Sequence, residues 1–133
     1  MEEELLASVP GARDLVEWFG RMPHFHDAEL RSISLSSTGP SLLQIYAFNM
    51  TDKVDDKGFF ILEKHAAVTV KLTDVTAIDL GDFDMQPGII FGMEFSKVDG
   101  EFRISWDSSY GVSGAIRAKL ISVSIQPGKP TAY

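Results

Sequence analysis

The first apolar positions of the chain recur at helical spacing. Within 10–20, Leu15, Trp18 and Phe19 fall at positions i, i+3 and i+4, which gives one apolar stripe. Gly20 and the following Pro23 supply a stop signal, so the pattern predicts a short helix. A stripe of this kind can also face a partner, but it more often belongs to the core. We therefore expect this helix to cover a sheet.

From Glu29 onward the apolar period changes from helical to alternating. Gly39 and Pro40 connect the first two alternating segments as a hairpin, and 51–58 is typical of a polar, charged loop. The apolar run 59–62 either begins the next strand or packs against the core as a segment of its own. The expected strands are 31–36, 42–50, 66–72, 74–80, 89–97, 101–107 and 115–126.

The clearest alternation belongs to 89–97 and 101–107. Asp99 and Gly100 between them tolerate the positive φ that a type I′ turn needs at both central residues, which predicts a tight hairpin. In 115–126 the apolar phase slips, which suggests a bulge near Leu120. The side chains expected to point inward are Ile89, Phe91, Met93, Phe95, Phe102, Ile104, Trp106, Ile121, Val123 and Ile125.

These segments predict a mainly β fold of the α+β type. We expect about seven mostly antiparallel strands in a curved sheet, a sandwich or a half-barrel, with the short N-terminal helix packed on it. The 133 residues fit one domain, 1–133, that is large enough to bury a core.

Composition and charge narrow the possible partners. Nineteen acidic and twelve basic side chains leave a net charge of −7, which disfavours nucleic acid and anionic membrane and favours a basic protein partner. The absence of cysteine excludes disulfides and thiolate chemistry and agrees with a reducing compartment. No apolar run is long enough to span a bilayer, and the acidic start Met1-Glu-Glu-Glu is unlike a secretory signal. We expect a cytoplasmic protein.

Two of the three histidines lie in the segment His24-Phe-His-Asp-Ala-Glu29. With His65 brought close by the fold, His24, His26 and Asp27 would be suitable metal ligands, but no hydrolase signature such as His-Glu-x-x-His is present. The structural interpretation places Trp18, His26, Asp27 and Glu29 at a corner between helix and strand. There His26 and Asp27 would satisfy backbone groups that no ladder pairs.

A second candidate group is acidic. Asp74, Asp79, Asp82 and Asp84, with Glu94 and Asp99 as further candidates, lie on predicted turns and strand ends. They lack the spacing of an EF-hand loop. Solvated loop charge explains them, and so does a surface offered to a basic partner. Ser108-Ser-Tyr-Gly111 is no nucleophile elbow and no glycine loop would cradle phosphate, so we expect neither an enzyme nor a bound cofactor.

The pattern Trp18-Phe-Gly20, Pro23 and Phe25-His-Asp-Ala-Glu29 resembles a bacterial family of predicted immunity proteins of polymorphic toxins, number fifty in that series. The likeness continues through 68–75, 86–95 and the closing β run. It implies a mostly β protein without catalytic residues that would block a toxin from the same or a neighbouring bacterium. The partner would then be a basic toxin domain, and the oligomeric state is left open.

Three hypotheses of different classes follow. The first is a toxin-neutralising binding protein that works by occlusion. The second is a metal-dependent hydrolase built on His24, His26, Asp27 and His65, where the metal would activate water. The third is a small-ligand or scaffold module whose sheet face holds an apolar pocket.

Overall fold

A computed structural model describes residues 8–21, 23, 25–83 and 88–129 of the chain. Within these residues the structure has one helix and six strands. They are α2 (Ala12–Phe19), β1 (Glu29–Ser34), β2 (Ser41–Val54), β3 (Phe60–Gly81), β4 (Gly88–Val98), β5 (Glu101–Tyr110) and β6 (Ser113–Pro127).

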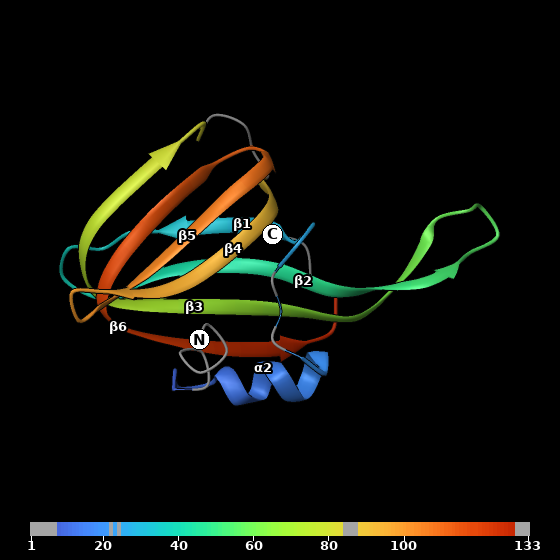
Figure 1. Cartoon of the computed structure of the whole chain (residues 1–133), viewed down its shortest axis with the longest axis horizontal. Helices are drawn as coiled ribbons and strands as arrows, with labels where there is room; N and C mark the ends of the chain where they lie inside the picture. The colour runs from blue at the N-terminus through green and yellow to red at the C-terminus, as the bar shows by residue number, and fades with distance from the viewer. Residues whose placement is uncertain (1–7, 22, 24, 84–87, 130–133) are drawn as a thin grey trace.

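The strands form one curved antiparallel sheet that closes into a barrel in the order β1-β2-β3-β6-β5-β4 (Figure 1). A short ladder completes the circuit, in which Glu29 of β1 lies opposite Ile89 and Leu30 lies opposite Gly88 of β4. The predicted mainly β architecture, with a curved antiparallel sheet and a short N-terminal helix, is confirmed.

The described residues form six strands where seven were expected, because β3 is continuous over 22 residues. It joins the two expected strands 66–72 and 74–80 and also takes in 60–62. Asp74 has a left-handed φ of 56° at the expected break, yet the ladder to β6 continues on both sides, with Thr73 opposite Leu120 and Val75 opposite Ala118. A single left-handed residue therefore interrupts the alternation in sequence without ending the strand.

The helix is the expected cover for the sheet. α2 packs against β6, and its residues Ala12, Leu15 and Phe19 are buried in the same hydrophobic core as the inward side chains of the barrel. Gly20 ends the helix with a φ of 80° and donates its N–H to the carbonyl of Val16. Burial of one side chain such as Leu15 contributes about 2 kcal/mol, so the stripe is a substantial anchor for this segment.

The predicted facing of β4 is wrong for its first half. Ile90, Met93 and Phe95 are buried, whereas Phe91 is 61% exposed and Ile89 is only partly covered. The register to β5 shifts between Ile89 and Ile90 and again between Ile90 and Gly92. These irregularities change which side chains point inward, and a prediction that assumes strict alternation along the strand does not include them.

The hairpin from β4 to β5 forms as predicted. Asp99 and Gly100 have φ values of 53° and 82°, and Val98 pairs with Glu101 across the turn. Ile104 and Trp106 are buried, with Phe102 partly so. The apolar phase of β6 does change between Ala118 and Ile121, but the register shift lies in β3, between Val75 and Ala77, rather than in β6.

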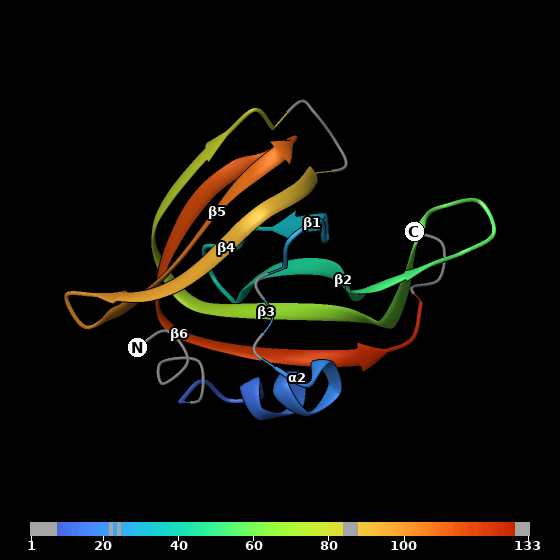
Figure 2. The same cartoon turned by 45° about the vertical axis from the view of Figure 1, so that its right-hand side comes forward.

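The far ends of β2 and β3 leave the barrel together as a projecting hairpin, residues 49–64, which we call the arm (Figures 1 and 2). The predicted loop 51–58 is therefore partly wrong, because β2 continues to Val54 and only 55–59 forms the turn. Asp55 Oδ1 accepts hydrogen bonds from the N–H groups of Lys57 and Phe59, at 2.9 and 3.0 Å. This Asx-type bonding shapes the turn.

Candidate functional site

The corner 25–28, directly before β1, is docked on β4. Phe25 and Asp27 both have left-handed φ values, 59° and 64°. The backbone of Asp27 donates to the carbonyl of Ile90 at 2.8 Å, and Ile90 donates back to Ala28 at 2.9 Å. The backbone groups of the corner are thus satisfied mainly by β4, which extends the short ladder that closes the barrel.

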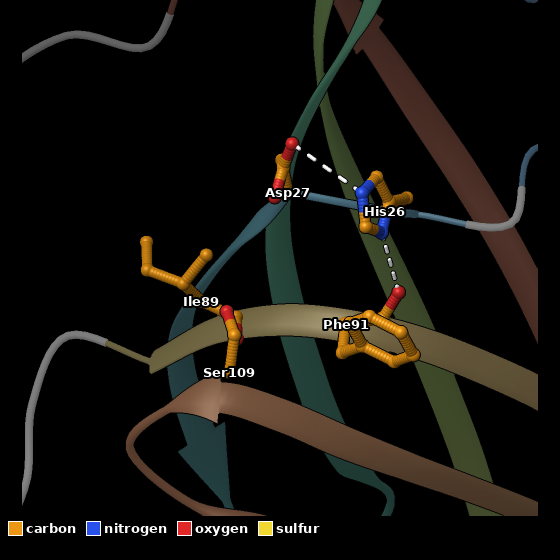
Figure 3. Close-up of polar contacts among 5 residues, drawn as sticks. All are labelled: His26, Asp27, Ile89, Phe91 and Ser109. Atoms are coloured by element: carbon orange, nitrogen blue, oxygen red, sulfur yellow. Dashed lines mark hydrogen bonds and ion pairs between the residues drawn. The ribbon is translucent and has the colours of Figure 1, made fainter.

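The side chains of His26 and Asp27 make polar contacts at this corner (Figure 3). His26 Nδ1 donates to the carbonyl oxygen of Phe91 at 2.7 Å, and Nε2 lies 3.6 Å from Asp27 Oδ2. The imidazole also meets the Phe91 ring edge-on, with centroids 5.4 Å apart. The two polar side chains are 60% and 41% exposed, so water reaches both. His26 contributes a side-chain bond to the backbone of β4, and Asp27 contributes its left-handed backbone conformation.

The histidines proposed as metal ligands have separate partners. His65 on β3 bonds through Nδ1 to the Tyr46 hydroxyl of β2 and stacks on its ring, with centroids 5.7 Å apart. His24 lies outside the described residues. Among residues 8–21, 23, 25–83 and 88–129, no group of three or more His, Asp or Glu side chains is placed to hold a metal ion.

Among the described residues, Tyr46 beside His65 has a raised pKa. Burial raises the pKa of its phenol, the positive charge of Arg31 opposes the rise, and the carboxylate of Glu29 adds to it. Glu29 in turn lies 3.6 Å from Arg31, on the strand that pairs with Tyr46. Glu29 and Arg31 therefore belong to a charged group on the outer face of β1 and β2.

Trp18 ties the helix to the base of the arm. Its indole Nε1 donates to the carbonyl of Lys64 at 3.0 Å, and the Lys64 ammonium lies 4.6 Å from the ring centroid. Beside it, Asn49 Nδ2 donates to the carbonyl of Phe19 at 2.9 Å, at the end of the helix. Lys64 has a left-handed φ of 56° and marks a register shift in the hairpin. Trp18 thus fixes the point where the arm leaves the barrel.

The four predicted acidic residues do not form one group. Asp74 and Asp82 are exposed at left-handed positions, and Asp84 lies outside the described residues. Asp79 instead lines a hollow of about 760 Å³ on the outer face of β3, β4, β5 and β6. Glu94 and Asp107 line the same hollow, so the structure brings Asp79 together with one expected and one unexpected carboxylate.

Small residues leave this hollow open. Gly92, Ser105 and Ala115 lie on neighbouring strands, where larger side chains would cover the sheet, and a Cβ at Gly92 would meet no atom within 4 Å. The charged residues around them are Asp79, Glu94, Asp107 and Arg103. Over the described part of the chain, none of these four takes part in an ion pair. Three carboxylates and one guanidinium therefore face solvent with their charges uncompensated by close partners.

A second hollow, of about 730 Å³, lies on the outer face of β1, β2, β3 and β6. Arg31, Gln44, Tyr46 and Thr69 are among the residues that line it. Both hollows are open depressions with many polar groups. They differ from the apolar pocket that the small-ligand hypothesis expects, since such pockets are enclosed mainly by hydrophobic side chains.

The arm carries a surface that the sequence did not predict. Phe59 is 68% exposed and Phe60 56% exposed, and three further apolar side chains of the arm are also open to solvent: Met50, Val54 and Ile61. The signal in the sequence is the apolar run 59–62 directly after the charged turn. We expected this run in a strand or against the core, because apolar runs are usually buried.

The outer edges of the arm have no neighbouring strand among the described residues. β1 pairs with β2 only up to Tyr46, and β6 pairs with β3 only from Ala66 onward. The arm is therefore a two-stranded ribbon open on both edges.

No protein-family model, curated protein or solved structure matches this chain. The resemblance to immunity proteins stays a prediction. In the described residues, no helix is long and apolar enough to cross a membrane.

Proposed function

We propose that this protein is a non-enzymatic binding protein that neutralises a bacterial toxin in the cytoplasm by covering the toxin's working surface. The pattern around Trp18 and 25–29, which resembles immunity proteins, supports this function. The observation that carries the proposal is the arm, with its five exposed apolar side chains. Soluble proteins seldom leave such a group in water unless a partner covers it.

The charge of the molecule supports a basic partner. The net charge of −7 attracts a cationic protein at long range and raises the rate of encounter. Asp79, Glu94 and Asp107 line one hollow together with Arg103, which leaves a local excess of negative charge. A basic toxin domain fits these charges, and occlusion needs no reacting group on the inhibitor.

Co-expression with the toxin domain encoded beside its gene tests the proposal. We expect cells that express the toxin domain alone to stop growing, and cells that also express this protein to grow. The two proteins should co-purify as a stable complex. If the cells are not rescued and no complex forms, the proposed function is wrong.

A further inference from the structure

The geometry of the arm points to a specific mode of binding. We propose that the arm, residues 49–64, inserts into a cleft of the partner that is apolar inside and basic at its rim. This inference rests on the proposed function and adds which part of the protein makes the central contact.

One face of the arm is apolar across both strands. Met50 lies opposite Leu62, and Val54 lies opposite Phe60, with an irregularity of β2 between the two pairs. Phe60 and Leu62 are two residues apart on β3 and therefore share a face. Side chains of directly opposed residues project from the same face of an antiparallel pair. Four apolar side chains are thus presented together, and Met50, Val54 and Phe60 among them are exposed. A cleft with an apolar interior is the complement of this face.

The arm is held in place before any partner arrives. Trp18 and Asn49 fix its base to the helix, at 3.0 and 2.9 Å. Thr51 Oγ1 donates to the carbonyl of Ile61 at 2.7 Å and links the two strands, while Asp55 shapes the turn. A docking element ordered in advance loses less conformational entropy on binding.

A second copy of this chain would cover the arm less well than a cleft of a partner protein does. One face of a ribbon with about six residues in each strand covers only about 200 Å². Stable interfaces bury about 800 Å² on each partner. Two copies that each carry −7 also repel one another. A cleft that surrounds both faces and the turn covers much more of the same arm.

The charges around the apolar face fit a basic rim. The arm carries four carboxylates, Asp52, Asp55, Asp56 and Glu63, against three lysines, Lys53, Lys57 and Lys64. The Lys64 ammonium is already placed over Trp18. The Asp55 carboxylate is bonded within the turn, so Asp52, Asp56 and Glu63 remain against Lys53 and Lys57, an excess of one negative charge that has the same sign as the charge of the whole molecule.

The test compares two double variants of the full chain. Met50→Ser with Phe60→Ser removes apolar groups from the arm face. Ile78→Ser with Leu120→Ser is the matched control, because these side chains are 45% and 60% exposed but lie outside the arm. Affinity for the purified toxin domain from the neighbouring gene is measured by calorimetry. We expect the arm variant to lose at least about 100-fold in affinity and the control to stay within about threefold.

Folding and contact are checked separately. Circular dichroism should show both variants folded, and the single variant Phe59→Ser at the turn serves as a second arm variant if the double variant unfolds. In the wild type, amide hydrogen exchange of 49–64 should slow when the toxin domain binds. Unchanged exchange there, or wild-type affinity in a folded arm variant, overturns the arm as the inserted element.

The outcomes separate this inference from the proposed function. Tight binding by the wild type and equally tight binding by the arm variant leave the function standing and overturn the inference. No binding by the wild type overturns both. A wild-type dimer in sedimentation that the arm variant loses assigns the arm to a second copy instead, and also overturns the inference.

Discussion

At the scale of single residues, a close approach between the start of the helix and β6 depends on Gly11. Its φ is 89°, and a Cβ there would lie 1.7 Å from the carbonyl oxygen of Val123. Gly11→Ala must therefore displace the helix from β6, and we expect it to cost at least about 2 kcal/mol in the free energy of unfolding. Thermal and urea melts measure this cost.

Gly20→Ala is the matched control for Gly11. Its φ is also positive, 80°, but a Cβ would meet no atom within 4 Å. Only the left-handed penalty of about 1–2 kcal/mol applies to it. Equal costs for the two substitutions would contradict the close packing of the helix segment on Val123.

Asp27 offers a test of the corner. Its φ is 64° and its side chain is 41% exposed, so its backbone conformation matters more than burial of its carboxylate. We expect Asp27→Ala to cost about 1 kcal/mol and Asp27→Gly to cost less, since glycine adopts this conformation freely. Thermal melts of the two variants decide the matter. A glycine variant as unstable as the alanine variant would show that the carboxylate itself is required.

The raised pKa of Tyr46 predicts that the stability of the folded protein depends on pH. Burial raises the pKa of its phenol in the folded state above the usual value of about 10. The folded state therefore holds this proton more tightly than the unfolded chain does. The resulting stability is fully present below about pH 10 and is lost as the pH rises through the folded-state pKa. Urea melts between pH 9 and pH 11 should show this loss in the wild type and less of it in Tyr46→Phe.

At the scale of elements, the junction between helix and arm depends on Trp18. Trp18→Phe keeps an aromatic ring but removes the hydrogen bond to the Lys64 carbonyl. We expect a loss of about 1 kcal/mol in stability and faster amide exchange at Glu63 and Lys64. Unchanged exchange at the base of the arm would show that the helix does not hold it.

Elements were predictable from sequence where local chemistry decides them. The helix follows from the spacing of Leu15 and Phe19, and the turn at Asp99 and Gly100 follows from their tolerance of positive φ. The exposure of Phe91 did not follow, because register shifts between β4 and β5 change the side-chain phase. Such shifts depend on a strand distant in sequence.

The arm and the hollow could not be predicted from the sequence pattern either. An apolar run such as 59–62 has the same composition whether it lies in a core or on a projecting ribbon. Asp79, Glu94 and Asp107 come from three strands, and the strand order β3-β6-β5-β4 brings them to one hollow. The exposure of the side chains at 25–29 depends on how this segment docks on β4, which the local pattern does not show.

At the scale of the whole molecule, two features lie on different parts of the surface. The arm projects from one end of the barrel (Figure 1), and the hollow around Asp79 lies on the outer face of β3, β4, β5 and β6. The molecule that carries both features has a net charge of −7. In the proposed function, long-range attraction brings a basic partner near, and the apolar arm makes the contact that holds it.

Titration of toxin activity tests the central claim most directly. Purified toxin domain from the neighbouring gene is mixed with increasing amounts of this protein, and the remaining toxin activity is measured. A binding protein that works by occlusion should abolish activity at one equivalent, and the toxin should recover its activity when the complex is dissociated. Full toxin activity at a large excess of this protein, or permanent inactivation by much less than one equivalent, would contradict the account.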